Sequence, residues 1–194
     1  MVINTISNRW RWVKSVIVDS VGSCYSQAYG QAGEFTGGVW PICKAGVSVA
    51  SSGSIAFLFG GFNNSTRFYD LFKFADKNYI TPLERDQWAY LKYTDADAFN
   101  RNGNYSSISS VAKPGSRYNA MSFVDNNTFY VFGGTGYGNA VNQYGELSDL
   151  WRYDGLDFVT KRPLWSWVKG DSSINSQGNY GTLGMASSSN KPSG

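Results

Sequence analysis

The stretch that decides the fold is Phe57-Leu58-Phe59-Gly60-Gly61, because it returns 73 residues later as Tyr130-Val131-Phe132-Gly133-Gly134. In both copies a short apolar run ends at a pair of glycines. Short apolar runs bounded by turn residues are typical of buried β-strands. Glycine has no Cβ, so the backbone can turn sharply there or approach a neighbour closely. The stretch therefore predicts a β-strand that occurs twice in one chain.

Other landmarks recur in a fixed order around this stretch, at separations between 73 and 79 residues. They are a proline three residues before a basic residue (Pro41 and Lys44, Pro114 and Arg117), the run Asp-Leu-aromatic-basic-aromatic (Asp70–Phe74, Asp149–Tyr153), the motif Trp-x-aromatic-hydrophobic-Lys (Trp10–Lys14, Trp88–Lys92, Trp165–Lys169) and a tyrosine (Tyr29, Tyr105, Tyr180). Self-similarity at a fixed period is the signature of a repeat architecture. The chain therefore contains an internal repeat.

Each copy of the repeat predicts four short strands and no helix. In the third strand of the second copy, Trp151 and Tyr153 alternate with Leu150 and Arg152, which is the pattern of a strand with one buried face. The polar stretches Thr94–Pro114 and Asp171–Gly194 lack apolar periodicity, so we expect them to be linkers. The expected strands are Val47–Ala50, Ile55–Phe59, Asp70–Phe74 and Trp88–Lys92, then Asn119–Val124, Thr128–Phe132, Asp149–Tyr153 and Trp165–Lys169.

The composition excludes several function classes. The 194 residues include no histidine, which removes the commonest neutral-pH general base and the imidazole metal ligand. We therefore predict no enzymatic activity and no cofactor for this chain. The net charge is +3 and no basic run exceeds Lys161-Arg162, so no nucleic-acid partner is expected. No run approaches about 18 apolar residues, so no membrane partner is expected either.

The repeated motifs resemble the kelch repeat, in which a hydrophobic run enters a glycine pair and is followed by a spaced aromatic residue and a tryptophan. Here these are Phe59-Gly60-Gly61 with Phe74 and Trp88, and Phe132-Gly133-Gly134 with Tyr153 and Trp165. The linker and the lead-in are similar to those of long-linker kelch proteins of the galactose-oxidase-like and attractin-like kind. The resemblance covers nearly the whole chain. The chain departs from the kelch pattern in the length of its repeat, which exceeds the ~50 residues of an ordinary kelch unit.

This resemblance implies an all-β fold of kelch-type β-propeller blades, each of four antiparallel strands, with an incomplete ring in one chain. Propellers have about four to eight blades. The chain is then a fragment of a longer propeller, a subunit that closes a ring with other copies (three chains would give six blades), or a pair of blades that stands alone. The implied division of residues 1–194 is an orphan outer strand at 9–14, blades at 41–92 and 114–169, and a linker at 170–194 to a missing blade.

The expected function is a non-enzymatic interaction module that presents loops to a protein or glycan partner. The alternative is part of a carbohydrate-active or galactose-oxidase-like enzyme whose catalytic residues lie outside this chain. The copper site of that family needs two histidines, so this chain alone does not build it. Repeated tryptophans such as Trp88 and Trp165 are expected to pack between strands. The candidate partner contacts are aromatic residues of the loops that do not repeat: Phe62, Phe68, Tyr137 and Tyr144.

Two further features bear on the cellular compartment. Cys24 and Cys43 are close enough in sequence to form a disulfide in an oxidising compartment, or they are two free buried thiols. Four Asn-x-Ser/Thr sequons favour an extracellular over a cytoplasmic location, although residues 1–12 have a polar middle unlike a signal peptide. The candidate glycosylation sites are Asn63, Asn64, Asn104 and Asn126.

Overall fold

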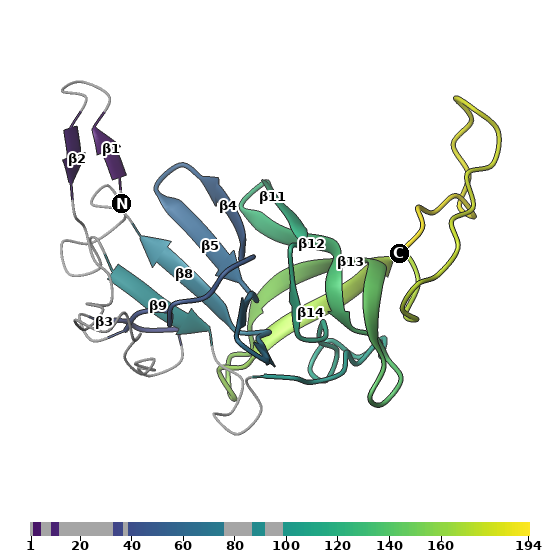
Figure 1. The fold of residues 1–194 in the computed structure, drawn as a ribbon. Helices are drawn as coiled ribbons and strands as arrows, with labels where there is room; N and C mark the ends of the chain where they lie inside the picture. The colour runs from purple at the N-terminus through teal and green to yellow at the C-terminus, as the bar shows by residue number, and fades with distance from the viewer. Residues whose placement is uncertain (1, 5–8, 12–32, 37–38, 76–86, 92–98) are drawn as a thin grey trace.

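The protein was analysed as a computed structural model that describes residues 2–4, 9–11, 33–36, 39–75, 87–91 and 99–194. All regular secondary structure within these ranges is β, and none of it is helical, which confirms the predicted all-β class. Two five-stranded antiparallel sheets form the body of the molecule (Figure 1). Two short hairpins accompany them: β1 (Val2–Asn4) with β2 (Arg9–Arg11), and β6 (Phe62–Asn63) with β7 (Thr66–Arg67).

The first sheet contains the four strands predicted for the first copy of the repeat. Its order is β3-β9-β8-β5-β4, and every neighbouring pair is antiparallel. The short strand β3 at one edge had no signal in the sequence. The strands are β3 (Phe35–Thr36), β4 (Ser48–Ser52), β5 (Ile55–Phe59), β8 (Leu71–Ala75) and β9 (Gln87–Leu91).

The second sheet contains the four strands predicted for the second copy, and three of them are longer than expected. Strands β10 and β11 both pair with β12, which pairs with β13, which pairs with β14. The ladder between β12 and β13 continues past the glycine pair through a bulge between Phe132 and Gly134. The strands are β10 (Arg117–Tyr118), β11 (Met121–Asp125), β12 (Thr128–Tyr137), β13 (Tyr144–Leu156) and β14 (Pro163–Lys169).

The glycine pairs explain why the two sheets differ beyond this point. Gly60, Gly61, Gly133 and Gly134 all have positive φ, between 63° and 97°, a conformation that side chains disfavour. In the first sheet the strand ends there, and the chain forms the separate β6–β7 hairpin. In the second sheet the bulge absorbs the pair, and pairing resumes at Gly134 opposite Leu147.

An aromatic core lies between the two sheets. The rings of Phe57 and Phe129 stack with centroids 5.1 Å apart, and Phe59 lies 5.4 Å from Trp165. Trp151 and Trp165 are fully buried in this cluster. These aromatic side chains dominate the packing energy because each one buries a large area. Trp165, which repeats Trp88, and Trp151, which occupies the position of Phe72, are therefore core residues, as predicted.

The repeated basic and aspartate landmarks form buried ion pairs. Lys44 Nζ lies 2.5 Å from Asp70, and Arg117 Nη1 lies 2.5 Å from Asp149, with all four side chains almost completely buried. Burial opposes ionisation of Asp149, but the Arg117 guanidinium outweighs it and holds the pKa of this carboxyl below its usual range. Burial lowers the pKa of Lys44, and Asp70 opposes that shift. The repeat thus encodes one ion pair per sheet.

The two linkers that are described share a local structure but differ in exposure. Isolated β-bridges join Asn104 to Lys113 in one linker and Asn179 to Lys191 in the other. Tyr105 of the first packs against Trp151 of the second sheet, with ring centroids 4.9 Å apart. Its counterpart Tyr180 is 71% exposed, on the segment that extends from the second sheet towards the C-terminus (Figure 1). Of the expected strand at 9–14, residues 9–11 pair with β1, and 12–14 lie outside the described residues.

Candidate binding surface

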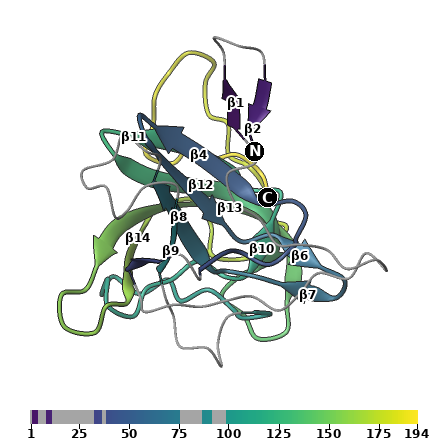
Figure 2. The same cartoon turned by 90° about the vertical axis from the view of Figure 1, so that its left-hand side faces the viewer.

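Four elements meet on one side of the molecule beside the inter-sheet core. They are the β6–β7 hairpin, β10, the last residues of β12 and the first residues of β13. Figure 2 shows β6, β7 and β10 side by side. The register across the second sheet pairs Tyr118 with Thr135 and Tyr137 with Tyr144. Tyr137 and Tyr144 lie on this side because β12 and β13 extend past the glycine pair.

Aromatic side chains from these elements contact one another. The rings of Phe62 and Tyr118 lie 4.7 Å apart, and those of Tyr137 and Tyr144 lie 5.4 Å apart. The Tyr144 hydroxyl donates to the Tyr118 hydroxyl at 3.0 Å, which joins the two pairs. The guanidinium carbon of Arg67 lies 5.0 Å from the Tyr144 ring centroid, a cation–π contact. We call these five residues the aromatic surface.

The aromatic surface is partly open to solvent. Tyr144 is 37% exposed, while Phe62, Arg67, Tyr118 and Tyr137 are intermediate in exposure. Partial burial, together with the hydrogen bond to Tyr118, raises the pKa of Tyr144 above its usual value, so its hydroxyl is protonated at neutral pH. The surface thus presents phenol hydroxyls and ring edges as well as a cation.

Three of the four predicted contact residues, Phe62, Tyr137 and Tyr144, come together here, and the fourth does not. Phe68 is only 5% exposed, so its expected place on a surface loop is corrected. Its ring packs edge-on against Phe99, and Lys44 Nζ lies 4.9 Å from its centroid. Both neighbours are distant in sequence, which is why the sequence did not place Phe68 in the interior.

Sequence reasoning missed Arg67 and Tyr118. Tyr118 follows the repeated Arg117, and the corresponding residue after Lys44 is Ala45. Tyr118 is therefore another aromatic residue that the repeat does not require, and the same criterion that selected Tyr137 applies to it. Arg67 lies in a polar hairpin, and nothing in the sequence indicates its contact with Tyr144.

A cleft of about 600 Å³ opens between the two sheets at the other end of β13. Its apolar wall includes Phe57 and Tyr153, and its polar wall includes the ion pair between Arg152 and Asp154, whose atoms lie 2.5 Å apart. The cleft is large enough for a small ligand. In the described part of the chain, no three His, Cys, Asp or Glu side chains gather to hold a metal ion. The same residues contain no helix with the length and apolarity of a membrane span.

The candidate modification sites differ in their surroundings. Asn64 and Asn126 are exposed at hairpin turns with positive φ, and Asn104 is exposed beside its β-bridge. The side-chain amide of Asn63 donates to the Cys43 carbonyl at 3.0 Å. Glycosylation at these four sites stays a prediction. Cys43 is disulfide-bonded, and no described cysteine is free. Cys24 lies outside the described residues, as does Tyr29.

Comparison with known proteins adds a weak likeness in fold. No protein-family model matches the chain, and no curated protein matches it. Among solved structures the chain is similar to that of YjhT, with 16% sequence identity and a TM-score of 0.42. The match covers 69% of this chain and 39% of YjhT, so this chain spans well under half the length of that protein. A likeness of this size carries no argument about function.

Proposed function

We propose that this chain is a non-enzymatic binding module of the kelch type, whose aromatic surface contacts a protein or glycan partner. The observation that carries the proposal is the convergence of aromatic residues that the repeat does not require. Phe62, Tyr118, Tyr137 and Tyr144 come from separate elements, yet they meet at one partly exposed place. Tyrosine and arginine are enriched among the residues that dominate binding energy at protein interfaces.

The kelch assignment makes the two five-stranded sheets consecutive blades of a β-propeller. Its support is the repeat itself. Each sheet has the four antiparallel strands that the motif implies, and each carries its own buried cation–aspartate pair at equivalent positions. The sheets pack face to face through the aromatic residues that the motif repeats.

We further propose that additional blades complete the ring, either from a longer polypeptide or from other copies of this chain. The outward face of the second sheet supports this. Phe59 and Leu71 of the first sheet are buried beneath the second sheet, whereas the equivalent residues Phe132 and Leu150 are only partly buried. Light scattering on the purified chain tests assembly from copies, because a stable monomer at high concentration contradicts it.

The binding proposal is tested with the double variant Tyr137→Ala/Tyr144→Ala. The purified chain is screened against a glycan array and against a displayed peptide library, and its best ligand is measured on the variant. We expect at least a tenfold loss of affinity with an unchanged urea midpoint. The matched control is Phe158→Ala, an aromatic residue that is 87% exposed in the β13–β14 loop. Equal losses in both variants, or unfolding of the double variant, contradict the proposal.

A further inference from the structure

Arg67 is the only cation of the aromatic surface, and no carboxylate of the described residues neutralises it. Lys44, Arg117 and Arg152 each lie 2.5 Å from an aspartate oxygen. Among the described residues, no carboxylate lies within ion-pair distance of Arg67. Its Nη1 instead donates to the Ser65 carbonyl at 2.6 Å. The guanidinium is therefore held in place, and no described carboxylate compensates its charge.

The hydrogen-bonding capacity of Arg67 is also incompletely used. Its Nε–H is buried and has no acceptor in the described part of the chain. A buried donor without an acceptor is unfavourable, and a guanidinium edge matches the two oxygens of a carboxylate. A carboxylate brought to this edge by a small shift of the side chain accepts from the Nε–H, which has no acceptor among the described residues.

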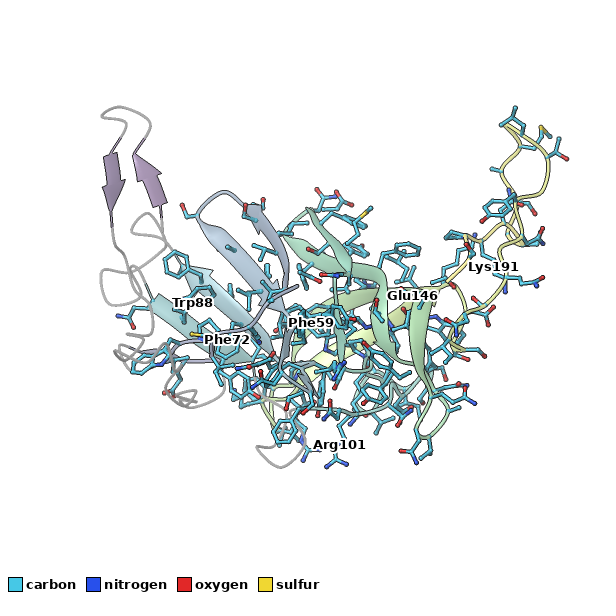
Figure 3. All side chains as sticks on the ribbon, in the orientation of Figure 1. Phe59, Phe72, Trp88, Arg101, Glu146 and Lys191 are labelled. Atoms are coloured by element: carbon cyan, nitrogen blue, oxygen red, sulfur yellow. The ribbon has the colours of Figure 1, made fainter. Side chains whose placement is uncertain are left out.

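The residues around Arg67 carry charges of both signs. The Arg67 backbone N–H donates to the Asn100 side chain at 2.8 Å, and Asn100 N–H donates back to the Arg67 carbonyl at 2.7 Å. Arg101 follows Asn100 in the chain and is exposed at the lower edge of the molecule (Figure 3). Glu146, labelled on β13 in the same view, accepts hydrogen bonds from Thr135. Within the aromatic surface itself, Arg67 is the one charged residue, and its positive charge favours an acidic ligand there.

The ring arrangement favours a protein over a sugar as that ligand. Sugars stack on open ring faces, but Arg67 covers a face of Tyr144, and Tyr137 meets Tyr144 edge-on at 62°. The adjoining hairpin loop, residues 138–143, consists mainly of Gly, Asn and Gln and carries Val141, which is 77% exposed at its tip. Tyrosine beside Gly- and Asn-rich loops is the composition of protein-binding paratopes.

We propose that the aromatic surface binds an acidic segment of a partner protein, in which an Asp or Glu carboxylate pairs with Arg67 beside Tyr144. This inference rests on the proposed function and names the partner class of the same surface. The cation–π contact fixes the guanidinium, so the carboxylate sets the position of the segment and the tyrosines contact the residues that flank it.

The test begins with a displayed library of random twelve-residue peptides, selected on the full chain. The strongest peptide is then measured by calorimetry on the wild type and on Arg67→Met. We expect Asp or Glu in nearly all selected peptides and about a tenfold or greater loss of affinity in Arg67→Met. Changing the peptide's carboxylate to its amide is expected to weaken binding to the wild type but to have little further effect on Arg67→Met. Arg152→Met, which removes a guanidinium at the other end of β13, is the matched control.

Each other outcome has a definite meaning. Selected peptides without acidic residues overturn the inference, as does binding that needs Tyr144 but not Arg67, and that second result leaves the proposed function intact. Binding of acidic glycans alone also overturns it, because the partner is then not a protein. If no ligand of either class binds, both proposals fail. If Arg67→Met does not fold, Arg67→Lys replaces it, since lysine keeps the charge but loses the paired donors.

Discussion

The buried pair of Arg117 and Asp149 is expected to be the most sensitive point of the fold, and Asp149→Ala tests it. Asp149 accepts hydrogen bonds from both terminal nitrogens of Arg117, at 2.5 and 2.7 Å. Its Oδ2 also accepts from the Tyr105 hydroxyl and from Trp151 Nε1, each at 2.6 Å. The substitution removes all four acceptor contacts at once and leaves a buried guanidinium without a counter-charge.

The magnitude follows from these contacts. Removing one partner of a buried ion pair costs about 3–5 kcal/mol, because the other charge stays buried. The unsatisfied donors of Tyr105 and Trp151 add to this, at about 1–3 kcal/mol each where no water reaches them. The total stability of a domain is about 5–15 kcal/mol. We therefore expect Asp149→Ala to lose a third or more of the stability, or to prevent folding.

Urea denaturation followed by tryptophan fluorescence measures the effect, because Trp151 and Trp165 are fully buried in the core. With an ordinary slope of about 2 kcal/mol per molar urea, loss of the ion pair alone lowers the midpoint by about 2 M, and the unsatisfied donors of Tyr105 and Trp151 lower it further. The control is Asp154→Asn, which breaks the partly exposed pair with Arg152 and is expected to cost less than about 1 kcal/mol. The double variant Arg117→Met/Asp149→Leu is expected to cost far less than the sum of its single changes.

Acid provides an independent check on the same carboxylate. The pKa of Asp149 is lower in the folded protein than its usual value. Its contribution to stability is therefore complete above the unfolded pKa of about 3.9 and is lost as the pH falls through the folded pKa. The difference between the wild type and Asp149→Ala should shrink below about pH 4. If the free energy of unfolding of Asp149→Ala lies within 1 kcal/mol of the wild-type value at pH 7, the substitution does not leave an uncompensated buried charge, and this reasoning is refuted.

Three further predictions concern the stability effects of Gly60, Tyr105 and the Cys43 disulfide. A Cβ on Gly60 would lie 2.5 Å from the Arg117 carbonyl oxygen, whereas a Cβ on Gly53, which has a similar φ, would have nothing within 4 Å. Gly60→Ala should therefore destabilise the protein much more than Gly53→Ala. Comparable urea midpoints for the two variants would contradict this. Tyr105→Phe keeps the ring packing but removes one donor to the buried carboxylate, and it should cost about 1–2 kcal/mol in the same assay. Reduction of the Cys43 disulfide should lower stability by about 3 kcal/mol, as measured by denaturation with and without dithiothreitol.

Much of the fold was predictable because the repeat marks its own strands. The apolar run before each glycine pair and the alternation around Trp151 indicated strands that the structure contains. The short strands β3 and β10 were not predictable, since two residues carry no periodicity. Nor was the continuation of β12, because whether pairing resumes after Gly133 depends on β13 and not on local sequence.

The candidate surface was predictable only where a residue departs from the repeat. Tyr137 and Tyr144 have no counterparts in the first copy, and that absence indicated a role outside packing. Phe68 met the same criterion but is buried by Lys44 and Phe99, which are close in space and distant in sequence. Arg67 gave no signal at all, since an arginine in a polar hairpin is ordinary until Tyr144 is placed beside it.

Repetition itself separates the residues that hold the sheets together from those free to bind. The backbone at the glycine pair of the first sheet is hydrogen-bonded to the repeated basic residue of the second sheet. Gly61 N–H donates to the Arg117 carbonyl at 2.8 Å, and Arg117 N–H donates to the Phe68 carbonyl at 3.0 Å. A change at either landmark therefore disturbs two sheets at once. The β12–β13 extension beyond the bulge has no counterpart in the first sheet, and its end residues Tyr137 and Tyr144 are not part of the buried core between the sheets. The binding residues on that extension can therefore change without altering the buried core between the sheets.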